Sequence, residues 1–220
     1  MIITGATGMV GRGVLLECLD HEAISRVLVI GRSSVEMEHP KLVELLHDDF
    51  EDFSAVKDQL AGYDACYFCL GISVAGLTEE QYTRITLHYT MALADVLFEA
   101  NPSSTFIYVS GAGTDSTEKG RITWARVKGK TENSLLQKGF KQAFMFRPGI
   151  IIPLRGIRSK TRLYQFFYDY FLWLIKFIKI VAPGSVCNTT QVGLAMIKAT
   201  LSGYEKPIFH PKDIIHLSGR

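Results

Sequence analysis

The stretch Thr4-Gly5-Ala6-Thr7-Gly8-Met9-Val10-Gly11 places three glycines at intervals of three, directly after the apolar residues 1–3. The apolar residues that follow recur at helical spacing, so the glycines lie in a turn between a short strand and a helix. In such a turn the first glycine allows the tight bend, the second lets the backbone approach a pyrophosphate, and the third lets helix and sheet pack closely. The unpaired amides at the start of the helix favour the negative pyrophosphate. The motif therefore predicts a dinucleotide-binding site that includes Gly5, Ala6, Thr7, Gly8, Met9, Val10 and Gly11.

Apolar, β-rich runs alternate with amphipathic stretches along most of the chain. That alternation is typical of a parallel sheet whose strands are covered by helices on both faces and are therefore almost continuously apolar. The expected strands are Met1–Thr4, Val27–Ile30, Leu42–His47, Ala65–Leu70, Thr105–Ser110 and Ala143–Arg147. The expected helices, besides the one after the glycine turn, are Glu79–Ala100, Val127–Lys138 and Gln191–Leu201. We therefore predict an α/β fold, a Rossmann-type doubly wound parallel sheet with helices on both faces.

The chain changes character after Pro153. Four basic residues come first: Arg155, Arg158, Lys160 and Arg162. They favour an anionic substrate such as a nucleotide diphosphate, whereas the aromatic stretch Leu163–Ile180 suits an apolar or ring-shaped one, and the sequence leaves both open. This stretch predicts a helix that is apolar on both faces, and such a helix is also often buried or packed against another subunit. We predict one dinucleotide-binding domain over residues 1–220, with residues 151–190 as a small helical extension on the substrate side, in a monomer or homodimer.

The composition is that of an ordinary globular enzyme and argues against other classes of protein. A net charge of +2 without a basic stripe argues against a nucleic-acid partner. Asp169, Lys176 and Lys179 interrupt the aromatic stretch short of the roughly 20 apolar residues of a membrane span, although peripheral contact with a membrane stays open. The cysteines, including Cys66 and Cys69 within a predicted strand, are expected to be structural thiols in a reducing compartment. Since no signal-like segment is recognised, we expect a cytoplasmic protein, and no metal site.

The end of the second predicted strand indicates which dinucleotide is bound. An NAD-binding chain usually places an acid there to hold the ribose 2′-hydroxyl. Here the sequence reads Gly31-Arg32-Ser33-Ser34, in which Arg32 can hold a 2′-phosphate through its planar guanidinium and Ser33 can add a hydrogen bond. We therefore expect NADP rather than NAD as the cofactor.

These motifs resemble the atypical branch of the short-chain dehydrogenase/reductase superfamily, in particular its small NAD(P)-binding, sugar-nucleotide-epimerase-like proteins related to the Tat-interacting-protein oxidoreductase. The resemblance covers essentially the whole chain. It implies that Asp49-Phe50, after the third strand, contacts the adenine. It also implies that Leu70-Gly71, at the end of the fourth strand, lies against the adenosine ribose. Pro148-Gly149-Ile150, after the sixth strand, matches the loop that meets the nicotinamide.

The same resemblance implies an active site with a serine and a tyrosine–lysine pair. Ser110 ends the fifth strand, where the family keeps its catalytic serine. In the family, the lysine binds the nicotinamide ribose and lowers the pKa of a tyrosine four residues before it, which exchanges a proton with the substrate during hydride transfer. Lys128 matches the lysine, but Trp124 stands at the tyrosine position. An indole N–H donates a hydrogen bond but does not shuttle a proton at neutral pH.

Trp124 leaves three hypotheses open. In the first, another acid replaces the tyrosine; the candidates are Tyr82, His88, Tyr89 and Tyr164. In the second, Ser110 supplies the proton through a water relayed from Lys128. In the third, the chain binds NADP without turnover and serves as a sensor or protein-interaction module. Because Ser110 and Lys128 are both present, we favour an NADP-dependent oxidoreductase or epimerase-like enzyme with a small-molecule substrate.

Overall fold

Seven parallel strands form the central sheet in the computed structural model, which describes residues 1–157 and 183–219. Their order across the sheet is β3-β2-β1-β4-β5-β6-β9. Their bounds are β1 Ile2–Thr4, β2 Val27–Gly31, β3 Leu42–Leu46, β4 Ala65–Phe68, β5 Thr105–Val109, β6 Gln142–Phe146 and β9 Ile208–Phe209. The strand order reverses between β1 and β4, and ligands of such sheets bind at the carboxyl ends of the strands beside that point. The predicted Rossmann-type fold is confirmed.

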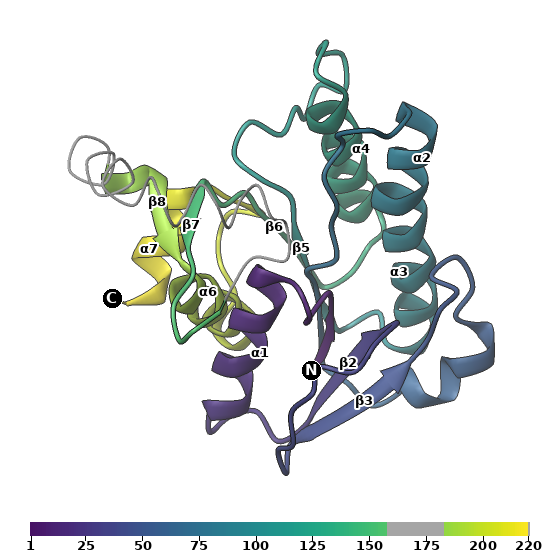
Figure 1. Cartoon of the computed structure of the whole chain (residues 1–220), viewed down its shortest axis with the longest axis vertical. Coiled ribbons are helices and arrows are strands. Elements are labelled where there is room, and N and C mark those ends of the chain that lie inside the picture. The colour runs from purple at the N-terminus through teal and green to yellow at the C-terminus, as the bar shows by residue number, and fades with distance from the viewer. Residues whose placement is uncertain (158–182, 220) are drawn as a thin grey trace.

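Helices cover both faces of the sheet (Figure 1). On one face lie α1 (Met9–Asp20), α6 (Thr189–Ser202) and α7 (Pro211–Ser218). On the other lie α3 (Tyr89–Ala100) and α4 (Thr123–Gln137). Neighbouring strand residues point to opposite faces: Ile3 packs with the first group and Ile2 with the second. This double burial explains why the strands are almost continuously apolar.

Helix α6 rests directly on α1, although the two are far apart in the sequence. A Cβ atom added to Gly13 of α1 would lie 2.5 Å from the Cβ of Thr189, so the helices approach too closely there for any side chain. Glu17 of α1 also accepts a hydrogen bond of 2.8 Å from the Thr190 hydroxyl. The helix that carries the glycine turn is thus held from behind by α6.

The predicted strands and helices are found close to their expected bounds, with two informative differences. The predicted helix Glu79–Ala100 is interrupted by a π-helical turn, η2 (Arg84–His88), between α2 (Glu79–Thr83) and α3. The predicted helix Val127–Lys138 begins earlier, because α4 starts at Thr123. Trp124 therefore lies in the first turn of α4. Short 3-10 turns are found at η1 (Ser54–Leu60) and η3 (Pro183–Ser185).

Several short elements were not predicted. Strands β7 (Ile150–Ile152) and β8 (Val186–Asn188) pair in parallel as a separate two-stranded sheet, and β9 and α7 complete the main body. The predicted aromatic helix Leu163–Ile180 lies outside the described residues, as do Arg158, Lys160 and Arg162 of the basic cluster. The division into a dinucleotide-binding body and a substrate-side extension stays a prediction. No helix within residues 1–157 and 183–219 is long and apolar enough to cross a membrane.

Candidate functional site

The glycine turn forms a cradle that only glycines fit. Gly5 has a φ of +69°, and a Cβ atom there would lie 2.7 Å from the Cys69 backbone. A Cβ atom on Gly11 would lie 2.3 Å from the Gly5 carbonyl oxygen. The first turn of α1 holds no acidic residue, and no side chain caps its Gly8 start. The amides at this helix start therefore fit the pyrophosphate of a nicotinamide dinucleotide.

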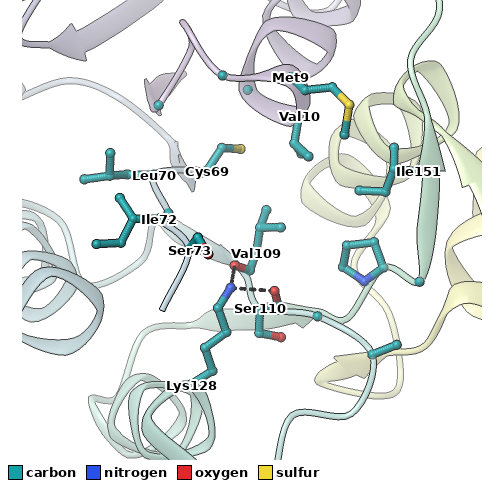
Figure 2. Close-up of a pocket in the computed structure, with 18 of the residues that line it drawn as sticks. Met9, Val10, Cys69, Leu70, Ile72, Ser73, Val109, Ser110, Lys128 and Ile151 are labelled. Atoms are coloured by element: carbon teal, nitrogen blue, oxygen red, sulfur yellow. Dashed lines mark hydrogen bonds between the residues drawn. The ribbon is translucent and has the colours of Figure 1, made fainter. Parts of the chain in front are cut away.

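A cavity of about 810 Å³ opens at the carboxyl ends of β1, β4, β5 and β6 (Figure 2). This volume is in the range typical of ligand sites. The cavity is lined by the predicted catalytic Ser110 and by most of the residues predicted for the cofactor site: Gly5, Thr7, Gly8, Met9, Val10, Gly11, Leu70, Gly71, Lys128, Pro148, Gly149 and Ile150. Segments from five parts of the sequence thus meet at one edge of the sheet, as the predicted site requires.

Lys128 reaches from α4 to the end of β5, and Figure 2 shows its nitrogen between two backbone oxygens. Its Nζ donates to the carbonyl oxygen of Ser110 at 2.6 Å and to that of Val109 at 3.4 Å. Burial of the ammonium lowers the pKa of Lys128 to about 8, against the opposing effect of the Glu132 carboxylate. Lys128 therefore carries a proton at neutral pH and loses it only slightly above.

The Ser110 side chain is bound to a buried carboxylate that the sequence analysis did not single out. Its hydroxyl lies 2.5 Å from Oε1 of Glu132, which is fully buried, and 3.2 Å from the Phe146 carbonyl oxygen. Both neighbours are acceptors, so the Ser110 proton points toward them. The signal for Glu132 in the sequence is its place four residues after Lys128, which puts both on one face of α4.

Glu132 also forms a buried ion pair with Arg147, which follows β6. The Nε of Arg147 lies 3.0 Å from Oε1 and 3.2 Å from Oε2 of Glu132, and its Nη2 bonds Oε2 as well. The same Nη2 donates to the Ser116 hydroxyl at 2.5 Å. Each charge is therefore compensated by the other, and the pair ties α4 to the ends of β5 and β6.

Trp124 does not line the cavity. Its ring packs over the loop after β5, so that a Cβ atom on Gly113 would lie 3.4 Å from its Cη2. The side chains predicted as replacement acids also lie elsewhere: Tyr82 is buried, His88 is exposed, and the Tyr89 ring packs 5.9 Å from the Phe50 ring.

Two titratable side chains line the cavity within the described part of the chain, Lys128 and Cys69. Burial raises the pKa of Cys69 to about 12, so this thiol holds its proton at neutral pH. Lys128 is therefore the lining group that exchanges a proton near neutrality. The predicted acid Tyr164 lies outside the described residues.

The residues predicted to contact the adenine half are more scattered. Arg32 is exposed just after β2, and Ser33 borders a second, smaller cavity beside the glycine turn. The Phe50 ring is buried in the core, and the Asp49 carboxylate accepts a hydrogen bond from the Glu51 amide at 2.9 Å. Ala6 is buried beneath the turn. None of these residues lines the larger cavity.

Known proteins with similar sequences and structures share this architecture. A family model described as NAD(P)H-binding matches residues 5–142. Protein HTATIP2 of Rattus norvegicus is 26% identical over 154 residues, which cover 69% of this chain and 62% of that protein, less than two thirds of its length. Protein fmp52, mitochondrial, of Aspergillus fumigatus is 29% identical over 168 residues, which cover 73% of this chain and 68% of that protein.

One solved structure is similar to this chain over nearly its whole length. ADP-L-glycero-D-manno-heptose-6-epimerase of Helicobacter pylori superposes with a TM-score of 0.67 and 13% identity, covering 99% of this chain and 80% of that one. At that identity the likeness concerns the fold alone. The family match, by contrast, contains the glycine turn, Ser110 and Lys128. The chain therefore belongs to the NAD(P)H-binding family.

Proposed function

We propose that this chain is an NADP-dependent oxidoreductase in which Lys128, beside Ser110, takes the acid/base place of the missing tyrosine. The observation that carries the proposal is the Lys128 ammonium at the end of β5, within a cavity that also holds the glycine turn. The family match adds support at the level of the cofactor, since its model is described as NAD(P)H-binding.

The proposed chemistry is reduction of a carbonyl group or its reverse. Bound NADPH would supply the hydride to the carbonyl carbon. The glycine turn would hold the pyrophosphate, and Pro148-Gly149-Ile150 would border the nicotinamide. Lys128 would donate the proton to the carbonyl oxygen, because its Nζ keeps one N–H beyond the two bonds to Val109 and Ser110. In the reverse direction, the neutral amine would accept the proton of an alcohol.

Glu132 gives Ser110 a different role from that of a hydrogen-bond donor. Since the Ser110 proton points to acceptors, its oxygen presents lone pairs to the cavity. We propose that Ser110 accepts a hydrogen bond from the substrate or from a water held near Lys128. Such a serine orients an alcohol or a hydrated carbonyl without donating to it.

The proposed function is tested by mixing the purified chain with NADPH and a panel of carbonyl compounds, and with NADP and a panel of alcohols. The panels should include anionic sugar nucleotides and apolar ring ketones, because the sequence supports both substrate types. We expect cofactor turnover with one of these classes. Tight NADPH binding without turnover on any substrate would favour the sensor. The expected cytoplasmic location stays a prediction, since the A. fumigatus relative is named mitochondrial.

Arg32 is proposed to select NADP, because it is exposed just after β2 and forms no ion pair within the described residues. Arg32→Asp should raise the Kd of NADPH by about 10- to 100-fold, since a charge-assisted bond to the 2′-phosphate is lost and a like charge is added. The Kd of NADH should change by about threefold or less. Isothermal titration with both cofactors measures this. An equal effect on both would contradict the role of Arg32.

The second candidate function, a catalytically silent NADP sensor, is favoured by the absence of a tyrosine from the described cavity lining. The variants Trp124→Phe and Trp124→Tyr distinguish the sensor hypothesis from the enzyme hypothesis. Because Trp124 packs on the loop and does not line the cavity, we expect turnover to fall far less than the roughly 100- to 10,000-fold that loss of a general acid causes. Steady-state kinetics of the parent and variant measure this. Turnover that appears only in Trp124→Tyr, with an inactive parent, would favour the sensor.

A further inference from the structure

A second cavity, of about 590 Å³, lies on the adenine side of the glycine turn. It shares Thr7 and Gly8 with the larger cavity, so the two meet at the turn. Its other walls are the second turn of α1, the loop after β2 and the segment after β7. In Rossmann folds the ribose 2′ oxygen is recognised at the end of the second strand. The position of this cavity therefore matches the 2′ substituent of a bound dinucleotide.

Three charged residues border the second cavity: Arg12, Glu36 and Arg155. Arg155 is already neutralised, because its Nη1 lies 2.8 Å from Oδ2 of Asp20 and 3.3 Å from Oε1 of Glu17. It is thus tied to α1 and does not line the larger cavity. Glu36 is exposed to solvent. Arg12 forms no ion pair with the residues that the structure describes.

The Arg12 side chain is held in place while most of its donors stay available. Its Nη1 donates to the Val35 carbonyl oxygen at 2.7 Å, and this bond spans from α1 to the loop after β2. Nε and Nη2 have no acceptor in the described chain. A guanidinium fixed in this way loses little freedom when it binds an anion, and its planar geometry suits a phosphate.

The hydroxyl groups around the cavity differ in their availability. Ser34 donates to Oε2 of Glu44 at 2.8 Å and accepts from the Glu36 amide at 2.9 Å, so its hydroxyl is occupied. Thr7 and Ser33 also border the cavity, and their hydroxyls bond no other described residue. One uncompensated cation and two available hydroxyls therefore face the same space.

We infer that Arg12 is a cofactor-selecting residue that binds the 2′-phosphate of NADP from the α1 side. The inference rests on the proposed NADP-dependence. It assigns part of the selectivity for NADP over NAD to a residue on α1, whereas the arginine that binds the 2′-phosphate usually lies at the end of the second strand. Arg12 lies on α1, whereas Arg32 lies in the loop after β2, next to Ser33. Each should therefore contribute separately to NADPH affinity.

The test compares Arg12→Gln and Arg12→Lys with the parent by isothermal titration of NADPH, NADH and adenosine 2′,5′-bisphosphate. Gln removes the charge but keeps an amide donor, whereas Lys keeps the charge without the planar fork. We expect Arg12→Gln to weaken NADPH and the bisphosphate about 10- to 100-fold, with Lys intermediate. NADH affinity should change by about threefold or less. Arg26→Gln is the matched control, because Arg26 lies at the opposite end of β2, over the Tyr63 ring.

The outcomes separate this inference from the proposed function. Equal weakening of NADPH and NADH by Arg12→Gln would mean that Arg12 supports the pyrophosphate or the turn, and would overturn the inference. Unchanged NADPH affinity in a folded Arg12→Gln would overturn it as well, while a parent preference for NADPH would leave the NADP assignment standing. A parent that binds NADH more tightly than NADPH would overturn the NADP assignment itself. A thermal melt of each variant excludes unfolding as the cause.

Discussion

Lys128→Met should lower kcat for carbonyl reduction by roughly 100- to 10,000-fold, the loss expected when a general acid is removed. Methionine keeps the length of the side chain but has no proton to give. Lys128→Arg should be almost as damaging, because arginine keeps the charge and the hydrogen-bond donors yet does not release its proton near neutral pH. Stopped-flow or steady-state kinetics with saturating NADPH measures both variants.

The pH dependence gives this prediction a readout that a structural role of Lys128 would not produce. Reduction requires the ammonium, so kcat should fall as the pH rises through about 8. Oxidation of the corresponding alcohol requires the neutral amine, so its kcat should rise through the same pH. An activity in Lys128→Arg close to that of the parent, or parallel pH profiles in the two directions, would contradict Lys128 as the acid.

Glu132→Leu should lower the free energy of unfolding by about 3–5 kcal/mol, the cost of leaving a buried charge without its partner. The variant leaves Arg147, a residue that is 8% exposed, with only the Ser116 hydroxyl among its present side-chain partners. Urea unfolding followed by circular dichroism measures the change. The isosteric Glu132→Gln separates loss of charge from loss of volume and should be destabilising too.

The matched control for this prediction removes both charges. Glu132→Leu combined with Arg147→Met should recover much of the lost stability, because apolar residues of similar volume often replace a buried ion pair at little cost. Both single variants should be less stable than the double variant. A Glu132→Leu protein within about 1 kcal/mol of the parent would mean that water or another group already compensates Arg147.

The sequence predicts best the elements that a local pattern defines, such as an apolar run or a fixed glycine spacing. The strands β1 to β6 are mostly apolar, and the glycine turn has a fixed spacing, so both are visible without tertiary information. Strands β7 and β9 were missed because runs of three and two residues carry no measurable period. Each of these strands is so short that pairing with a distant segment, rather than the local preference of its residues, decides its conformation.

The site was predictable where family motifs cover it and not where side chains meet across elements. Ser110 and Lys128 were found, but the pairing of Glu132 with Arg147 joins a helix to the end of a strand 15 residues away. In the same way, the role proposed for Arg12 depends on the loop after β2, to which its side chain is hydrogen-bonded. The displacement of Trp124 from the cavity depends on the loop after β5, which no spacing rule describes.

The contact between Gly13 and Thr189 has a consequence for the order of events during protein synthesis. Helix α1 leaves the ribosome well before α6, the helix that packs against it. Until α6 emerges, the face of α1 that carries Val14 and Cys18 lacks part of its apolar cover. The helix that carries the glycine turn thus gains this cover only after α6 has been translated.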